Sequence, residues 1–304
     1  MCQLLGMNCA KLTDFTFSFT GFAKRGGETD IHQDGWGLVF YEGRGIRAFH
    51  DSLPASQSPI ANLVSNYPTC KTLNMISHIR YATSGACLLE NVHPFQREIW
   101  GIPFVFAHNG DVPEFSHSNS RSRQIRLGRN RQCKEGDDFI FYYTPVGTTD
   151  SEAIFCAMLN EMRNAFEFPP SFSVLYTFLN EICMEIVKGD ELDNCIIFNF
   201  LLSCGEKSLF AFSWPGSRPG SNVWNGLYYI VRKHPFQMAT LKDCDVVVDF
   251  SKVTTIDDCV AVTATTPLTK DETWIEFKRG ELLLFQKGKP LSSAKECELA
   301  DYLI

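Results

Sequence analysis

The 304-residue sequence lacks any apolar stretch that approaches the ~20 residues of a membrane-spanning helix, and its start has no basic-then-apolar signal segment. It also lacks an excess of positive charge, because 28 Lys and Arg residues stand against 35 Asp and Glu residues and leave a net charge of −7 at pH 7. Binding to nucleic acid or to an anionic membrane usually requires a basic surface. These absences predict a protein with neither a nucleic-acid nor a membrane partner.

Cysteine is not scarce, with 12 copies, but the patterns that mark its usual special roles are missing. The sequence has no Cys-x-x-Cys pair, no tight cluster of Cys and His, and no Asn-x-Ser/Thr glycosylation site. Most of these thiols are therefore expected to be small buried hydrophobes in a reducing compartment, and not disulfides or metal ligands. The sequence thus predicts a cytoplasmic protein without a metal site.

Internal repeats and a convincing linker are also missing, so residues 1–304 are predicted to form a single domain, long enough to bury a real core. Two segments with helical spacing, residues 151–164 and 172–186, lie between two groups of strand-like apolar runs. One stretch fits neither pattern: residues 116–138 are polar and locally basic. Loops of that length are usually lids or disordered segments, and we expect a flexible insertion here.

What the sequence does contain begins at its second residue. Met1-Cys2 precedes a short apolar run that suits a buried strand. Initiator methionine is normally removed before a residue as small as cysteine, so the mature chain is expected to start at Cys2. A thiol and a free α-amine would then share one carbon, and an amine with a pKa near ~8 is a suitable proton acceptor. A nucleophile that carries its own base is typical of catalysis by an N-terminal residue.

Three further stretches place polar residues where strands end or a helix begins. Residues 75–85 alternate and then run into a polar turn, residues 104–107 form an apolar strand that ends in His-Asn-Gly, and residues 145–152 form a loop before a helix. Each has an ordinary structural interpretation, because Asn-Gly is a common turn pair and Thr149 with Glu152 has the spacing of a capping box. Taken singly, none of them identifies a function.

Together with Cys2, these stretches resemble the class II glutamine amidotransferases, which are N-terminal-nucleophile hydrolases, and in particular their stand-alone, YafJ-type members. The resemblance covers nearly the whole chain in the same order. It is carried by residues 1–7, 17–21, 25–27, 32–37, 78–80, 90–95, 107–110 and 147–152. It implies an α+β fold, a four-layer αββα sandwich.

The resemblance also assigns roles. Cys2 would attack the carboxamide and form a thioester, with the side-chain amide of Asn109 and the backbone N–H of Gly110 as the oxyanion hole. Other residues would bind the amino-acid head of glutamine. The α-carboxylate would meet the planar guanidinium of Arg80 and the α-ammonium would meet Asp150, while Thr83 could bond the carboxylate or only shape the turn.

Other matching residues are assigned supporting roles. Arg25 and Asp34 match the family pattern and are interpreted as structural supports near the nucleophile. His78, His93 and His108 fit no compact zinc motif, and structural roles are expected for them. The family uses no metal, so no cofactor is expected. The turn after Arg80 departs from many relatives, which carry histidine where this chain has Ser84.

Three functions remain open at this point. The chain could cleave glutamine and pass ammonia to a separate accepting or peptidase subunit, since it encodes no acceptor domain of its own. It could instead hydrolyse a γ-glutamyl amide in thiol metabolism, of the glutathione kind, with water as the only acceptor. Finally, it could be a catalytically silent binding or assembly module. Retention of Met1 in the mature protein would favour this last interpretation.

Overall fold

The computed structural model describes residues 2–67, 70–82, 85–116, 127, 139–188, 190, 196–218, 220–252 and 254–300. Thr83, Ser84 and all of the expected insertion except Ser116 and Leu127 lie outside the described residues.

A seven-stranded sheet surrounds the first strand of the chain. Strand β1 (Gln3–Asp14) lies near its centre and pairs antiparallel with β4 (Lys71–Ile79) on one side and with β12 (Cys259–Ala264) on the other. The strand order is β13-β9-β12-β1-β4-β2-β3. The remaining members are β2 (Trp36–Glu42), β3 (Gly45–Asp51), β9 (Tyr228–Lys233) and β13 (Ile275–Glu276).

A six-stranded sheet of order β15-β14-β8-β7-β6-β5 faces the first one. Its strands are β5 (Phe95–Ile99), β6 (Ile102–Asp111), β7 (Ile197–Cys204), β8 (Ser208–Trp214), β14 (Glu281–Gln286) and β15 (Lys289–Leu291). A separate two-stranded ribbon is formed by β10 (Met238–Thr240) and β11 (Val247–Asp249).

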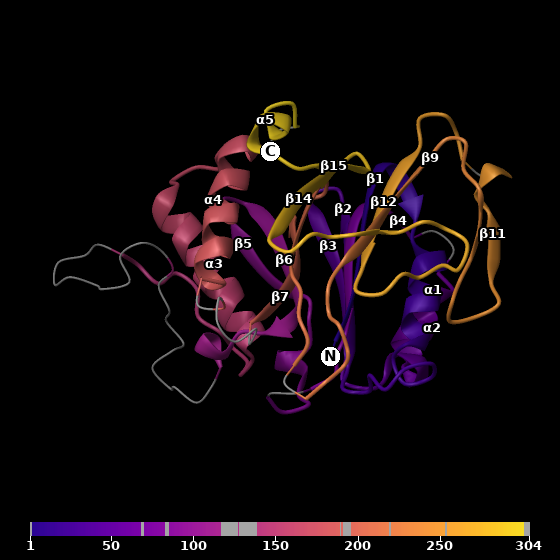
Figure 1. The fold of residues 1–304 in the computed structure, drawn as a ribbon, viewed down its shortest axis with the longest axis horizontal. Helices are drawn as coiled ribbons and strands as arrows, with labels where there is room; N and C mark the ends of the chain where they lie inside the picture. The colour runs from indigo at the N-terminus through magenta and orange to yellow at the C-terminus, as the bar shows by residue number, and fades with distance from the viewer. Residues whose placement is uncertain are drawn as a thin grey trace.

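Helices cover the outer face of each sheet. Helices α1 (Thr16–Lys24) and α2 (Pro59–Ser65) lie on the seven-stranded sheet, and α3 (Asp150–Ala165) and α4 (Phe172–Ile186) lie on the six-stranded sheet (Figure 1). A short α5 (Ala294–Cys297) packs beside α4. The 3₁₀ turns are η1 (Ala55–Gln57), η2 (Leu89–Asn91), η3 (Pro113–Phe115) and η4 (Phe250–Lys252). This arrangement confirms the predicted four-layer αββα sandwich.

The period-2 alternation of the strands divides the core into three apolar layers. In β1, Leu5 and Met7 pack toward α1, whereas Leu4 packs between the two sheets. On the opposite sheet, Ala107 packs between the sheets, and Phe106 packs toward α3. Residues in phase with Leu4 and Ala107 therefore point into the layer between the sheets, which we call the inter-sheet layer.

The capping box predicted at the start of helix α3 forms only in part. Thr149 caps it as expected, accepting a hydrogen bond from the backbone N–H of Glu152 at 3.3 Å. The Glu152 carboxylate does not bond back to Thr149. It accepts from the backbone N–H groups of Val146 and Gly147, at 3.1 and 2.6 Å, and pairs with Arg97 at 2.5 Å. Only half of the capping box therefore forms, because the buried carboxylate instead orders the loop before the helix.

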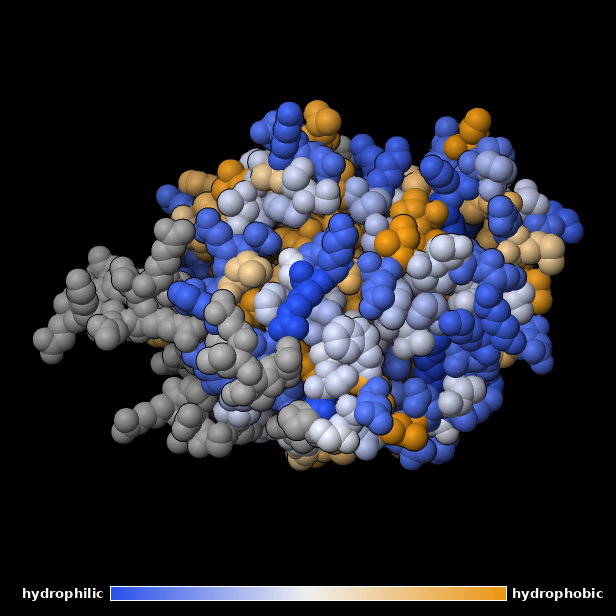
Figure 2. Space-filling view, viewed as in Figure 1, coloured by the Kyte–Doolittle hydropathy of each residue, from blue (hydrophilic) through white to orange (hydrophobic). Residues whose placement is uncertain are grey.

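The face in Figure 2 mixes hydrophilic side chains with scattered hydrophobic ones. Among the helices in the described part of the chain, none has the length and apolar character needed to span a bilayer.

Candidate active site

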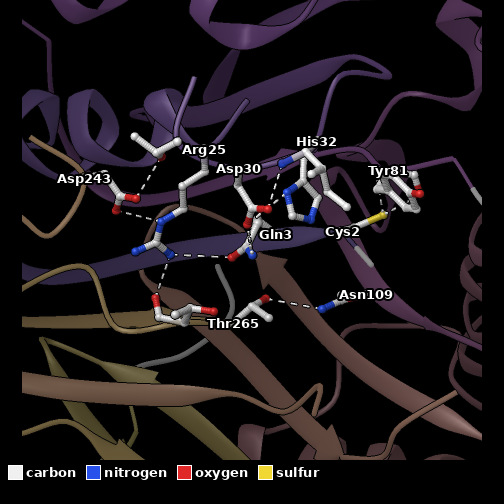
Figure 3. A network of polar contacts seen from close by, with 12 residues as sticks. Cys2, Gln3, Arg25, Asp30, His32, Tyr81, Asn109, Asp243 and Thr265 are labelled. Atoms are coloured by element: carbon white, nitrogen blue, oxygen red, sulfur yellow. Dashed lines mark hydrogen bonds and ion pairs between the residues drawn. The ribbon is translucent and has the colours of Figure 1, made fainter. Parts of the chain in front are cut away.

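Cys2 lies directly before β1, at one end of the inter-sheet layer. The register of β1 with β4 sets Gln3 opposite Ile79, so Cys2 reaches the residues that follow β4. The backbone N–H of Tyr81 donates to the Cys2 sulfur at 3.4 Å, and the thiol lies 3.6 Å from the Tyr81 carbonyl oxygen (Figure 3). The thiol is thus held against the chain just beyond Arg80.

The electrostatic surroundings of Cys2 act in opposite directions. Burial raises the pKa of the Cys2 thiol, while the Tyr81 hydrogen bond and the positive charges of Arg80 and Arg218 lower it. Burial dominates, so the thiol is protonated near neutral pH. A reaction at this sulfur therefore needs a nearby proton acceptor.

Strand alternation brings three of the predicted residues to this end of the inter-sheet layer. Ile76 packs in that layer, and every second residue after it points the same way, which includes Arg80 just beyond β4. In the same way, Cys2 is two positions before Leu4 and shares its phase. On the opposing sheet, Ala107 leads to Asn109. The two strands belong to different sheets and are far apart in sequence, so only the sandwich brings these side chains together.

Asn109 is fully buried and is tied to the start of β1 through one hydroxyl group. Its side-chain N–H₂ donates to Thr265 Oγ1 at 3.4 Å, and the same oxygen accepts from the Leu4 backbone N–H at 2.9 Å (Figure 3). Its Oδ1 has no hydrogen-bond partner among the described residues. The Asn109 backbone carbonyl accepts from the Asn199 side chain at 3.2 Å, which fixes this peptide in place.

Gly110 has a steric reason to be glycine. A Cβ at this position would overlap the carbonyl oxygen of Ile197 on the neighbouring strand and approach Nε2 of His108 to 2.5 Å. Close packing against β7 therefore requires glycine here.

Arg80 is buried, and its guanidinium reaches the loop that follows it. It donates to the carbonyl oxygens of Ala86 at 3.0 Å and Gly85 at 3.3 Å. Asp34 supports the other side of this loop, accepting from the Ala82 N–H at 2.7 Å. The Arg80 guanidinium therefore holds the chain that follows Tyr81, the residue that contacts Cys2.

Asp150 is the first residue of α3 and lies close to the end of β6. One of its carboxylate oxygens accepts from the backbone N–H of Val112 at 3.2 Å, and the other accepts from the Ser151 N–H at 2.8 Å. These bonds join the start of α3 to the strand that carries Asn109 and Gly110. The structure thus brings Asp150 beside that strand end.

Arg25 lies near Gln3 at the start of β1 (Figure 3). Its buried guanidinium pairs with Asp243 at 2.8 Å and donates to the carbonyl oxygens of Thr266 at 2.8 Å and Pro267 at 2.9 Å. A longer contact of 3.5 Å reaches the side chain of Gln3, next to Cys2. Arg25 therefore joins the end of α1 and the loop after β12 to the start of β1.

The three histidines gather into one buried cluster near the site. The ring centroids of His78 and His93 lie 4.1 Å apart. The backbone N–H of His108 donates to His93 Nδ1 at 3.3 Å, and His108 Nδ1 lies 2.9 Å from Ser151 Oγ. Burial lowers the pKa of all three, so the imidazoles are neutral. Within the described ranges, no group of three or more His, Cys, Asp or Glu side chains is arranged to hold a metal ion.

Two residues of the site escaped the sequence argument. Arg218 lies in the loop between β8 and β9, and its Nη2 is 3.3 Å from Oδ2 of Asp111. Burial raises the pKa of Asp111, the charge of Asp150 raises it further, and the charge of Arg218 lowers it. One feature of the sequence could have pointed to Asp111, because it follows Asn109 by two positions and shares its strand phase. Nothing local marked Arg218, which lies in a Pro- and Gly-rich connection.

Comparisons with known proteins identify the family of this chain. The family model described as "Glutamine amidotransferases class-II" matches residues 1–301. A Haemophilus influenzae protein named "Putative glutamine amidotransferase" is 40% identical over 96% of this chain and 86% of its own length. "Putative glutamine amidotransferase YafJ" of Escherichia coli is 39% identical over 95% of this chain and 99% of its own. The crystal structure of a "predicted glutamine amidotransferase" from Pseudomonas aeruginosa has a TM-score of 0.65 at 36% identity, covering 96% of this chain and 100% of its own.

Proposed function

The chain belongs to the class II glutamine amidotransferases, and from this premise we propose that it cleaves the γ-carboxamide of glutamine or of a γ-glutamyl compound through a thioester on Cys2. The observation that supports this most is the convergence of Cys2, Arg80 and Asn109 at one end of the inter-sheet layer. Each of the three fills a role that amide cleavage needs, as nucleophile, substrate anchor and oxyanion donor.

The first step needs a base beside Cys2. Removal of Met1 leaves the Cys2 α-amine free, with a pKa near ~8, and the thiol proton passes to it. The sulfur then forms a bond to the substrate carbonyl carbon while the C=O electron pair moves onto oxygen. Burial raises the pKa of the thiol, so proton transfer in the same site is required for attack near neutral pH.

The oxyanion is the next requirement. Asn109 Nδ2 and the Gly110 N–H are the proposed donors, and such donors contribute about 3–4 kcal/mol each to the transition state. The Asn109 amide makes a long 3.4 Å bond to Thr265, which a charged oxygen would outcompete. Collapse breaks the C–N bond, and the leaving amine departs with the proton held by the α-amine.

The thioester is then hydrolysed. Water gives a proton to the free α-amine and attacks the thioester carbon, the C–S bond breaks, and the sulfur regains a proton. The acid product is then released. We propose that, until it leaves, Arg80 binds its α-carboxylate and Asp150 binds its α-ammonium. A bond from Thr83 to the carboxylate stays a prediction, since Thr83 lies outside the described residues.

We propose hydrolysis by one domain formed from residues 1–304. In support of one domain, β1 from the start of the chain pairs with β12 from near its end. A separate ammonia-accepting or peptidase subunit and a cytoplasmic location stay predictions.

The decisive experiment is intact mass spectrometry before and after treatment with the glutamine-analogue electrophile diazo-oxo-norleucine. We expect the mass before treatment to be that of the chain without Met1. Treatment should add the mass of one adduct, and the modified peptide should contain Cys2. Cys2→Ala should gain no adduct. A mature protein that retains Met1 and does not react would contradict the proposal and favour a silent binding module.

A further inference from the structure

The loop that carries Arg218 is anchored to the same residue that holds Asn109. Gly216 and Asn225 close its base with reciprocal backbone hydrogen bonds of 3.0 and 2.9 Å. The side chain of Asn199 donates to the Asn109 carbonyl at 3.2 Å and to the Asn225 carbonyl at 3.4 Å. Arg218, two positions beyond Gly216, therefore lies at the end of the sandwich that holds Cys2, which we call the nucleophile end after the role proposed for Cys2.

The contact that Arg218 makes there is accessible. Its side chain is 25% exposed and that of Asp111, its ion-pair partner at 3.3 Å, is 43% exposed. Ion pairs this exposed typically contribute only about 0–1 kcal/mol to stability, so stability is a weak reason to place this pair beside a nucleophile. The pair is also open enough for a ligand carboxylate to reach the guanidinium.

Cys2 thus has a cation on each side of the layer. Arg80 comes from the seven-stranded sheet, and Arg218 comes from the loop after β8 of the six-stranded sheet. Both charges act on the thiol, lowering its pKa against the effect of burial. One guanidinium suffices for the single α-carboxylate of glutamine. A second guanidinium, held by Asp111 at the end of the strand that carries Asn109, matches a substrate with a second carboxylate.

We propose that Arg218 determines specificity in this site, as an anion subsite for a carboxylate on the leaving group of a γ-glutamyl substrate. This inference rests on the proposed function, because it requires amide cleavage at Cys2. Asp111 pairs with Arg218, and the substrate carboxylate shares the guanidinium with Asp111 or displaces it. The bond that breaks is the same C–N bond, and the amino acid leaves as its amine with water as the only co-reactant.

The test compares two substrates that differ by one carboxylate, γ-glutamylglycine and γ-glutamylethylamide, with glutamine as the reference. In the wild type, kcat/KM for the glycine compound should be about tenfold or more above that for the ethylamide. Arg218→Gln should remove most of this preference, chiefly by raising KM for γ-glutamylglycine. Arg218→Lys, which keeps the charge, should restore part of it.

Two further variants separate recognition from structure. Asp111→Asn combined with Arg218→Gln keeps the local net charge, so a lost preference in the double variant does not come from an unpaired Asp111. Asp111→Asn alone should keep or strengthen the preference for γ-glutamylglycine, because one anion that shares the Arg218 guanidinium is removed. Arg44→Gln, in the exposed turn between β2 and β3 at the far end of the sandwich, should change no rate.

The outcomes are distinguishable. Hydrolysis of glutamine with no preference for γ-glutamylglycine over the ethylamide would overturn the anion subsite and leave the proposed function intact. Equal losses on both substrates in Arg218→Gln and in the double variant would also overturn it, making Arg218 a structural partner of Asp111. A wild-type protein inactive on all three compounds would overturn both proposals.

Discussion

The inter-sheet layer has polar residues at both ends, and the two ends are built differently. At the far end, Asn74 donates from one amide nitrogen to Ser203 Oγ at 2.6 Å and to the carbonyls of Gly205 and Ser208 at 3.1 and 2.9 Å. Its bonds run directly from the first sheet to the second. At the nucleophile end, charged and titratable groups gather instead, around Cys2 and Arg80.

The two ends also differ in how completely their buried atoms are paired. Both nitrogens of His78 and Oδ1 of Asn109 lack hydrogen-bond partners within the described ranges, against one oxygen of Asn74 at the far end. Buried unpaired polar atoms are costly. Among the described residues, the far end therefore joins the two sheets, and the nucleophile end is the less completely paired of the two.

The largest effect should come from Cys2. We expect Cys2→Ala to abolish amide hydrolysis, to less than about 10⁻³ of the wild-type rate, with the fold intact. Ammonia release and the thermal midpoint would be measured together. Cys9→Ala is the matched control on the same strand, because this buried thiol packs toward α1 and should affect stability and not turnover. Near-wild-type turnover by Cys2→Ala would defeat the mechanism.

Arg80 should have the next largest effect. Arg80→Ala should lose about 2–4 kcal/mol in kcat/KM, because it removes a charge-assisted pair with the substrate carboxylate. Arg80→Lys keeps the charge without the planar fork and should recover only part of the loss. Since Arg80 also holds Gly85 and Ala86, the free energy of unfolding would be measured for both variants. If both variants lost as much free energy of unfolding as they lost in kcat/KM, Arg80 would serve only to hold the loop that follows it.

Asp150 is tested by a two-by-two cycle. Asp150→Ala should cost about 2–4 kcal/mol in kcat/KM with glutamine, and little with a des-amino analogue that lacks the ammonium. Asp150→Asn is the matched variant, since it keeps an acceptor for Val112 or Ser151 and removes only the charge. Additive effects of residue and substrate would show that Asp150 serves only the start of α3.

The histidine cluster at the nucleophile end should make the free energy of unfolding depend on acidic pH. In the folded protein burial lowers the pKa of His78, His93 and His108, whereas in the unfolded chain they titrate near ~6.5. The unfolded state therefore binds more protons below that pH. The free energy of unfolding should fall between pH 7 and pH 5, by up to about 1.4 kcal/mol per pH unit for each histidine. A flat profile over this range, measured by urea titration, would contradict neutral buried imidazoles.

The smallest effect should come from the far end, on stability alone. Asn74→Ala removes an N–H₂ group whose two hydrogens are shared among three oxygens of the second sheet. This change should lower the free energy of unfolding by about 1–3 kcal/mol, with kcat/KM nearly unchanged. Asn66→Ala, at the exposed end of α2, should stay within about 0.5 kcal/mol of the wild type. Loss of turnover without loss of stability in Asn74→Ala would erase the distinction between the two ends.

Much of the fold could be predicted because it depends on local periodicity. The helices at residues 151–164 and 172–186 are observed as Asp150–Ala165 and Phe172–Ile186, since caps and apolar spacing act within a few residues. The candidate site was less predictable. Arg218 reaches it only through the bridge from Gly216 to Asn225 and the bonds of Asn199, which join distant parts of the chain.

By itself, the sequence determined the alternation of the strands, the order of the polar stretches and a cysteine at the second position, because each is a property of neighbouring residues. Only the tertiary structure decided which of these groups meet. It directed Glu152 to Arg97 and the preceding loop, stacked His78 on His93, and put Arg218 beside Asp111. Such contacts depend on the register of two sheets packed face to face, and no local pattern specifies that register.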